Sequence, residues 1–122
     1  MRTAVAALLG QNEHIAVVGV AEDGLRALEL VKVLSPDVIV TDLEMPVMHG
    51  ADFVMEQMSR RAVPIIVFSG LEMDDPLAVM AMRGGAVDFL RKPTKSEEVL
   101  GQQQLLSSKI LQAGAQGCPL VP

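Results

Sequence analysis

Short, nearly continuous apolar runs are the feature that most constrains how this chain can fold. Residues 38–40 and 65–68 are uninterrupted apolar runs, and residues 87–90 are interrupted only by Asp88. Continuous apolarity is typical of strands covered on both faces, which is the situation in a parallel sheet with helices above and below. These three runs, together with residues 15–20, in which Ile15, Val17, Val18 and Val20 are β-branched, predict four strands of a parallel sheet.

Amphipathic segments separate the predicted strands. In residues 25–34 the apolar side chains recur every three residues, and Ser35 and Pro36 then stop the helix. Asp75 is expected to cap the helix that begins at Pro76. Strands that alternate with helices predict right-handed crossovers in an open α/β sheet. The five predicted helices cover residues 3–9, 25–34, 51–60, 76–83 and 94–113, the last of which opens with a capping box at residues 94–97.

Composition narrows the class of protein. With 122 residues, 50% of them hydrophobic and 20% charged, the chain fits one globular domain. A net charge of −5 disfavours nucleic acid and anionic membranes as partners, and no uncharged apolar run reaches the roughly 18 residues of a membrane span. Cys118 is the only cysteine and the first residues do not resemble a secretion signal, so a cytoplasmic location is expected.

Three polar residues follow three of the predicted strands. These residues are Asp42, Ser69 and Lys92, and parallel strands bring their carboxyl ends to one edge of the sheet. A carboxylate nucleophile, a hydroxyl donor and an ammonium in one cleft suit phosphoryl transfer, in which the protein mainly positions groups and neutralises charge. Each residue alone is more often a turn residue, a helix cap or a solvated charge. The occurrence of all three at the same end of successive strands favours a functional site.

The sequence resembles the receiver domains of bacterial two-component response regulators, from residue 1 to about residue 113. Residues 37–50, DVIVTDLEMPVMHG, are similar to the receiver segment with the phosphoacceptor and the loop after it. Residues 85–93, GAVDFLRKP, are similar to the segment that ends in Lys-Pro. The short motifs EMPVM (residues 44–48) and AVDF (residues 86–89) are most similar to those of the regulatory domains of chemotaxis methylesterases, the CheB class. The resemblance implies a flavodoxin-like (CheY-like) doubly wound parallel sheet.

The resemblance also implies a role for each site residue. Asp42 would accept a phosphoryl group from a histidine kinase, Lys92 would pair with the phosphoryl oxygens, and Ser69 would donate a hydrogen bond to them. Phe89 would be the aromatic side chain that rotates and passes the signal to an effector domain or partner protein. The methylesterase domain itself is absent from these residues, so the chain is not expected to be an enzyme.

Receivers normally begin with an apolar strand that ends in two acidic residues, and these carboxylates help to hold Mg²⁺. Met1 aligns part-way into the first helix, so this chain lacks both features. Only Asp42 and the backbone carbonyl of Glu44 match the metal-binding positions of the family, which predicts a weak Mg²⁺ site. The carboxylates of Glu44, Asp74 or Asp75 are less favoured substitutes.

Without a first strand, we expect a truncated receiver over residues 1–113 with about four strands and five helices. Residues 114–122 are expected to form a flexible tail or the start of a linker. The missing strand would leave backbone groups unpaired on the strands at residues 15–20 and 38–41. These strands then pair directly, or another chain segment fills the gap by swapping, or the element around Ile15 rearranges and exposes apolar surface for dimerisation. The remaining alternative is that the true start lies upstream of Met1 or that the sequence is a fragment. A homodimer and a strand-swapped oligomer are therefore among the expected assemblies.

Two other functions compete with the phosphoacceptor hypothesis. A degenerate receiver, unable to bind Mg²⁺ well, would act as a protein-binding or dimerisation module. A phosphatase of the haloacid dehalogenase type also uses an aspartate nucleophile, but it needs more chain for a substrate cap. The receiver interpretation is the stronger one.

Overall fold

The computed structural model describes residues 19–21, 23–44, 48–92, 99–113 and 119–121. Within this part of the chain, strands and helices alternate as the sequence predicts, and every strand pair is parallel. The predicted helix at residues 3–9 and the capping box at residues 94–97 lie outside the described residues. The elements are β1 (Gly19–Val20), α2 (Gly24–Leu34), β2 (Val38–Thr41), α3 (Gly50–Arg60), β3 (Ile65–Ser69), α4 (Pro76–Arg83), β4 (Asp88–Arg91), α5 (Val99–Ala113) and β5 (Pro119–Val121).

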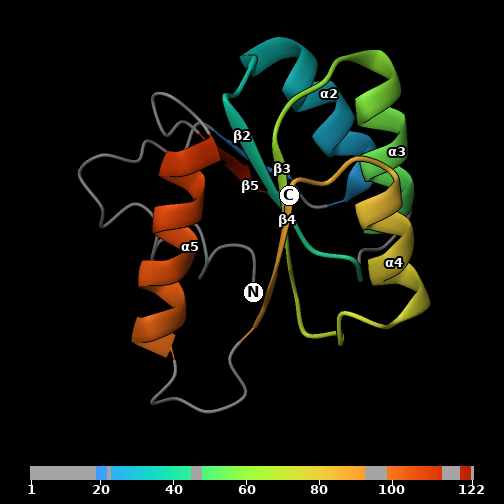
Figure 1. The fold of residues 1–122 in the computed structure, drawn as a ribbon. Helices are drawn as coiled ribbons and strands as arrows, with labels where there is room; N and C mark the ends of the chain where they lie inside the picture. Colours follow the sequence, from blue (N-terminus) through green and yellow to red (C-terminus); the bar gives the residue numbers. More distant parts are fainter. Residues whose placement is uncertain (1–18, 22, 45–47, 93–98, 114–118, 122) are drawn as a thin grey trace.

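Helices cover both faces of the sheet. The strand order is β1-β5-β2-β3-β4, and Figure 1 shows α5 on one side of the sheet and α2, α3 and α4 on the other. The connections through α2, α3 and α4 all cross the sheet in one direction, whereas α5 leads back from β4 to β5. Crossovers of the same hand that run in opposite directions place their helices on opposite faces. The predicted doubly wound α/β fold is confirmed.

The C-terminal segment departs from the prediction of a flexible tail. Its residues 119–121 form β5, which lies between β1 and β2, with Leu120 opposite both Gly19 and Ile39. The sheet therefore has five strands, not about four, and β1 and β2 do not pair directly. A gap inside a sheet would leave backbone N–H and C=O groups unpaired. A short segment of the same chain fills that gap here.

The sheet separates two hydrophobic cores. Every residue of β2 and β3 is buried, so the continuous apolar runs do belong to strands covered on both faces. Alternate side chains enter opposite cores: Ile39 packs beneath α2 and α3, and Val38 and Val40 pack beneath α5. The core beneath α5 consists of Val38, Val40, Ile66, Phe68, Leu90, Leu106 and Ile110.

Helix ends follow the local sequence signals. The Asp75 carboxylate accepts a hydrogen bond from the Leu77 N–H at 2.9 Å, and Pro76 occupies the first turn of α4, as predicted. Asp23 caps α2 through the Arg26 N–H. Ser35 ends α2 in the left-handed conformation, with φ of 48°. None of the helices in the described ranges is both long enough and apolar enough to span a bilayer.

Candidate functional site

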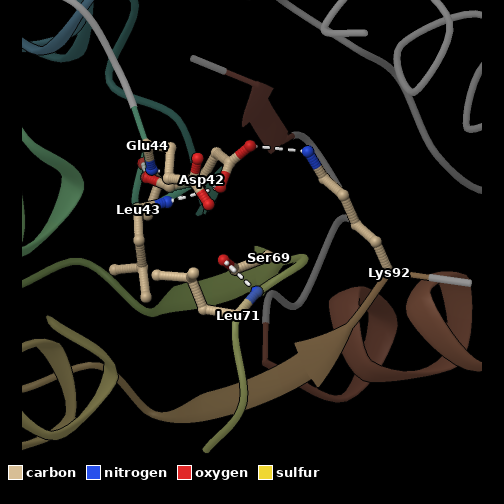
Figure 2. A network of polar contacts seen from close by, with 7 residues as sticks. Asp42, Leu43, Glu44, Ser69, Leu71 and Lys92 are labelled. Atoms are coloured by element: carbon tan, nitrogen blue, oxygen red, sulfur yellow. Dashed lines mark hydrogen bonds and ion pairs between the residues drawn. The ribbon is translucent and has the colours of Figure 1, made fainter. Parts of the chain in front are cut away.

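The ends of β2, β3 and β4 lie side by side at one edge of the sheet. Thr41 pairs with Val67, and Ser69 pairs with Arg91. This register places Asp42, just after β2, and Lys92, just after β4, on either side of the end of β3. Lys92 Nζ lies 2.5 Å from Asp42 Oδ2, and the two side chains are only 13% and 23% exposed (Figure 2). The structure thus brings together two residues that are 50 positions apart in the sequence.

The other oxygen of the Asp42 carboxylate faces the backbone. Asp42 Oδ1 accepts hydrogen bonds from the N–H groups of Leu43 at 2.6 Å and Glu44 at 3.3 Å. Hydrogen bonds to an ionised carboxylate are stronger than those between neutral groups. The carboxylate is therefore held in one orientation, with Oδ2 directed to Lys92 (Figure 2).

Ser69 lies between these two residues, at the end of β3. It is fully buried, and its Oγ accepts a hydrogen bond from the Leu71 N–H at 3.1 Å. A hydroxyl that accepts one bond still has its own proton to donate. The Ser69 carbonyl also accepts the Lys92 N–H at 2.8 Å. That bond ties the backbone after β4 to the end of β3 and fixes where the Lys92 side chain starts.

Two further residues shape the site without having been predicted as site residues. The Phe68 ring lies below the ammonium of Lys92, with 5.9 Å between its centroid and Nζ, which is within the range of a cation–π interaction. Gly50 approaches the backbone of Asp42 so closely that a Cβ atom there would lie 1.9 Å from the Asp42 carbonyl oxygen. The Gly50 N–H donates to the Leu43 carbonyl at 3.0 Å. In the sequence, Gly50 stands out only as part of the receiver-like segment, because no local pattern reveals this contact.

Phe89, the predicted switch residue, lies in β4 and is 8% exposed within the core beneath α2, α3 and α4. Next to it, Asp88 Oδ2 lies 2.6 Å from Lys109 Nζ and so joins β4 to α5. Burial alone would raise the pKa of Asp88, but the hydrogen bond from Lys109, the Phe89 N–H and the charge of Lys109 together lower it below its usual value of 3.8. The movement of Phe89 stays a prediction.

Among the described residues, the oxygen donors near Asp42 do not by themselves complete a magnesium site. In the part of the chain that the structure describes, no group of three or more His, Cys, Asp or Glu side chains is arranged to hold a metal. Of the suggested substitutes, Asp75 caps α4, and the Glu44 side chain is exposed. Mg²⁺ requires near-octahedral oxygen coordination. Asp42 and the Glu44 carbonyl alone do not provide it.

Comparison with known families identifies the fold. The sequence profile of the response regulator receiver domain family matches residues 1–104. The chain belongs to the response regulator receiver domain family. The receiver domain of CheB from Thermotoga maritima is 35% identical, with a TM-score of 0.83 over 93% of this chain and 87% of that one. The receiver domain of NarL from Mycobacterium tuberculosis is 31% identical, with a TM-score of 0.70 over 87% of this chain and 84% of that one.

Curated relatives point to the same group of receivers. A protein-glutamate methylesterase/protein-glutamine glutaminase of Pseudoalteromonas atlantica is 40% identical over 114 residues. One from Bacillus licheniformis is 35% identical over 117 residues. The matches cover 89% and 93% of this chain but only 30% and 33% of these relatives. This receiver domain is therefore similar to the receiver domains of CheB proteins and is a two-component signalling module.

Proposed function

We propose that this receiver accepts a phosphoryl group on Asp42 from the phosphohistidine of a histidine kinase. The observation that carries the proposal is the 2.5 Å contact between Asp42 Oδ2 and Lys92 Nζ, which joins the residues that follow β2 and β4 across the end of β3. The contact joins a nucleophilic carboxylate to a cation able to neutralise phosphoryl charge. The buried Ser69 hydroxyl lies at the end of the strand between them.

In the proposed transfer, an oxygen of the Asp42 carboxylate attacks phosphorus while the bond from phosphorus to the histidine nitrogen breaks. The imidazole leaves with the electron pair of that bond and takes up a proton. The product is an acyl phosphate on Asp42, which carries more negative charge than the carboxylate did. Lys92 then pairs with the phosphoryl oxygens, and the Ser69 hydroxyl donates its proton to one of them.

The switch we propose starts at Ser69. Its Oγ holds the Leu71 N–H in the unphosphorylated state, so a turn of the hydroxyl toward the phosphoryl group changes the loop after β3. Space vacated by Ser69 would be filled by Phe89, and the altered surface would be recognised by an effector domain or partner protein in the cytoplasm. Methylesterase activity is expected only from a chain that also contains the remaining part of the methylesterase relatives, which this chain does not match. Mg²⁺ is the ion that the family relationship suggests.

Phosphorylation can be measured directly. The chain is incubated with acetyl phosphate and Mg²⁺ and analysed by intact-protein mass spectrometry, beside a receiver known to be labelled under these conditions. We expect one added phosphoryl group, which is lost in Asp42→Asn and retained in the matched control Asp37→Asn, because Asp37 lies before β2, at the other end of that strand. The absence of any labelled species, with the reference receiver labelled, would contradict the proposal.

A degenerate receiver is the second candidate, and the small number of magnesium ligands among the described residues around Asp42 is the observation that favours it. Such a module would use its surface for protein binding without being phosphorylated. Isothermal titration with MgCl₂ separates the two candidates further. Tight Mg²⁺ binding to a monomeric chain would exclude the degenerate module, whereas no heat of binding together with no labelling would support it.

A further inference from the structure

A hollow of about 350 Å³ lies between α2 and α3, away from the site around Asp42. Its apolar lining comes from Leu28 and Val31 of α2, which are only 4% and 3% exposed. Ligand sites in proteins typically combine such an apolar floor with a few polar groups, and they begin at about this volume. The lining residues are Leu28, Val31, Lys32, Gln57, Arg60 and Arg61.

Three of these six residues are cations, in a chain whose net charge is −5. Cations near helix C-termini stabilise the helix dipole, which accounts for Lys32 and Arg60 taken singly. The same effect applies to Arg61, the C-cap of α3, but it does not account for the presence of all three cations around one hollow. Arg60 Nε also lies 3.0 Å from Glu56 Oε1, so one of the three charges is partly balanced. The hollow keeps an excess of positive charge.

One wall of the hollow is held by a buried amide. Gln57 is 2% exposed, and its Nε2 donates to the Arg61 carbonyl at 3.0 Å. The Arg61 N–H in turn donates to the Gln57 carbonyl at 2.9 Å. These two bonds fix the backbone from which the Arg61 side chain extends. A fixed starting point lowers the entropy lost when the guanidinium binds an anion.

The hollow and Asp42 lie at opposite ends of the sheet. Helices of an α/β sheet run antiparallel to its strands, so the last turns of α2 and α3 lie near the beginnings of β2 and β3. Asp42 follows the end of β2. A ligand in the hollow would therefore not block the approach of a phosphodonor to Asp42.

We propose that the hollow between α2 and α3 binds a small amphipathic anion. Its apolar body would rest on the aliphatic parts of the cationic side chains, above the nearly buried Leu28 and Val31. Its carboxylate, sulfonate or phosphate would face the charged ends of Lys32, Arg60 and Arg61. Guanidinium groups bind such oxyanions through paired N–H donors. This site goes beyond the proposed receiver function and does not depend on it.

The probe for this proposal is 1-anilinonaphthalene-8-sulfonate, which has an apolar body and one sulfonate. It is titrated into the ¹⁵N-labelled chain while amide chemical shifts are recorded. We expect saturable shifts confined to residues 28–33 and 57–62. The double variant Lys32→Gln/Arg61→Gln should bind about tenfold more weakly, because two charged contacts are lost.

A matched control removes the same charge elsewhere. Arg26→Gln/Arg83→Gln alters two exposed cations outside the hollow and should bind the probe as the wild type does. The neutral analogue N-phenyl-1-naphthylamine tests whether the sulfonate matters and should bind more weakly than the sulfonate. Shifts spread over other elements, equal affinity of both double variants, or equal affinity for the neutral analogue would each overturn the proposal. Asp42→Asn should leave binding of the probe unchanged. A failure of the phosphoacceptor proposal is thus distinguishable from a failure of this one.

Discussion

The two oxygens of the Asp42 carboxylate have different partners, and the difference bears on how the residue would react. Oδ1 is bound by the backbone N–H groups of Leu43 and Glu44, whose positions are set by the loop. Oδ2 is bound by Lys92, a flexible side chain that can follow a charge. Under the proposed function, Oδ2 is the oxygen that receives the phosphoryl group, because its partner can move onto the phosphoryl oxygens without a change in the backbone.

At Gly50, a single added methyl group should be poorly tolerated. Gly50→Ala would place its Cβ against the carbonyl of Asp42, at 1.9 Å in the unrelaxed backbone. We expect the free energy of unfolding to fall by about 2–3 kcal/mol, as for other overpacked sites. Urea denaturation followed by far-UV circular dichroism measures it, since the chain has no Trp or Tyr.

Gly70→Ala is the matched control for this substitution. Nothing lies within 4 Å of the position of a Cβ at Gly70. Its stability should therefore stay within about 0.5 kcal/mol of the wild type. Equal effects of the two substitutions would show that the close approach of Gly50 to Asp42 is not a constraint.

The ion pair between Asp88 and Lys109 should make stability depend on pH in the acid range. The pKa of Asp88 is lowered in the folded chain, so its contribution is present above the unfolded value of 3.8 and is lost as the pH falls through the folded value. Asp88→Asn should cost about 0.5–1 kcal/mol at pH 7, the range for a partly exposed pair. Urea titrations at several pH values should show this deficit shrinking below pH 3.8.

Asp74→Asn is the control, because Asp74 is an exposed carboxylate on the loop before α4. Its unfolding free energy should follow that of the wild type at every pH. A deficit in Asp88→Asn that stays constant down to strongly acid pH would mean that the ion pair does not contribute through the charge of Asp88.

At the scale of elements, β5 is the least expected part of the sheet. It is only three residues long, yet it connects β1 to the strand that leads to Asp42. Its pairing is made by the backbone, with Leu120 in register with neighbours on both sides. Removal of the N–H of Leu120 should therefore weaken the pairing of β5.

Leu120→Pro removes that N–H, whereas Leu120→Ala keeps it. We expect the proline variant to be less stable than the alanine variant by about 1–3 kcal/mol, the cost of leaving a backbone group inside the sheet without a partner. Amide hydrogen exchange at Val40 should also be faster in the proline variant, whereas Ile39, whose N–H donates to the Pro64 carbonyl, serves as an internal reference. Identical stability and exchange in both variants would argue against β5 as a paired strand.

At the scale of the whole molecule, the two cores should unfold together. The strands β2 and β3 send alternate side chains into both cores, so neither core can open without disturbing the strands that the other needs. Ile110→Ala, which empties a fully buried position beneath α5, should destabilise the chain by about 2–5 kcal/mol. The urea midpoints of the Ile39 and Ile66 methyl signals, one in each core, should fall together.

Leu111→Ala is the control on the same helix, because Leu111 is 38% exposed. Its effect should be clearly smaller than that of Ile110→Ala. Two separate transitions in Ile110→Ala, with the core beneath α2, α3 and α4 unaffected, would show that the cores are independent units.

Much of the fold could be predicted from the sequence, and so could the placement of three site residues at one edge of the sheet, because these features depend on local patterns. The runs at residues 38–40 and 65–68 predicted buried strands, and Asp75 and Pro76 predicted the start of α4. Strand ends also placed Asp42, Ser69 and Lys92 at one edge. The boundaries were less accurate: β4 begins at Asp88 rather than Val87, although the Val87 N–H already donates to the Ile65 carbonyl at 2.8 Å.

Sequence alone determined that this chain alternates buried strands with amphipathic helices and carries an acid, an alcohol and an amine after three of the strands. Only the tertiary structure decided that the segment at residues 119–121 pairs between β1 and β2, because a strand's partner depends on which backbone groups are left open by the rest of the sheet. It also decided that Gly50 must lack a side chain and that Lys92 reaches Asp42. Such contacts join residues far apart in the chain, and no periodicity within a segment specifies them.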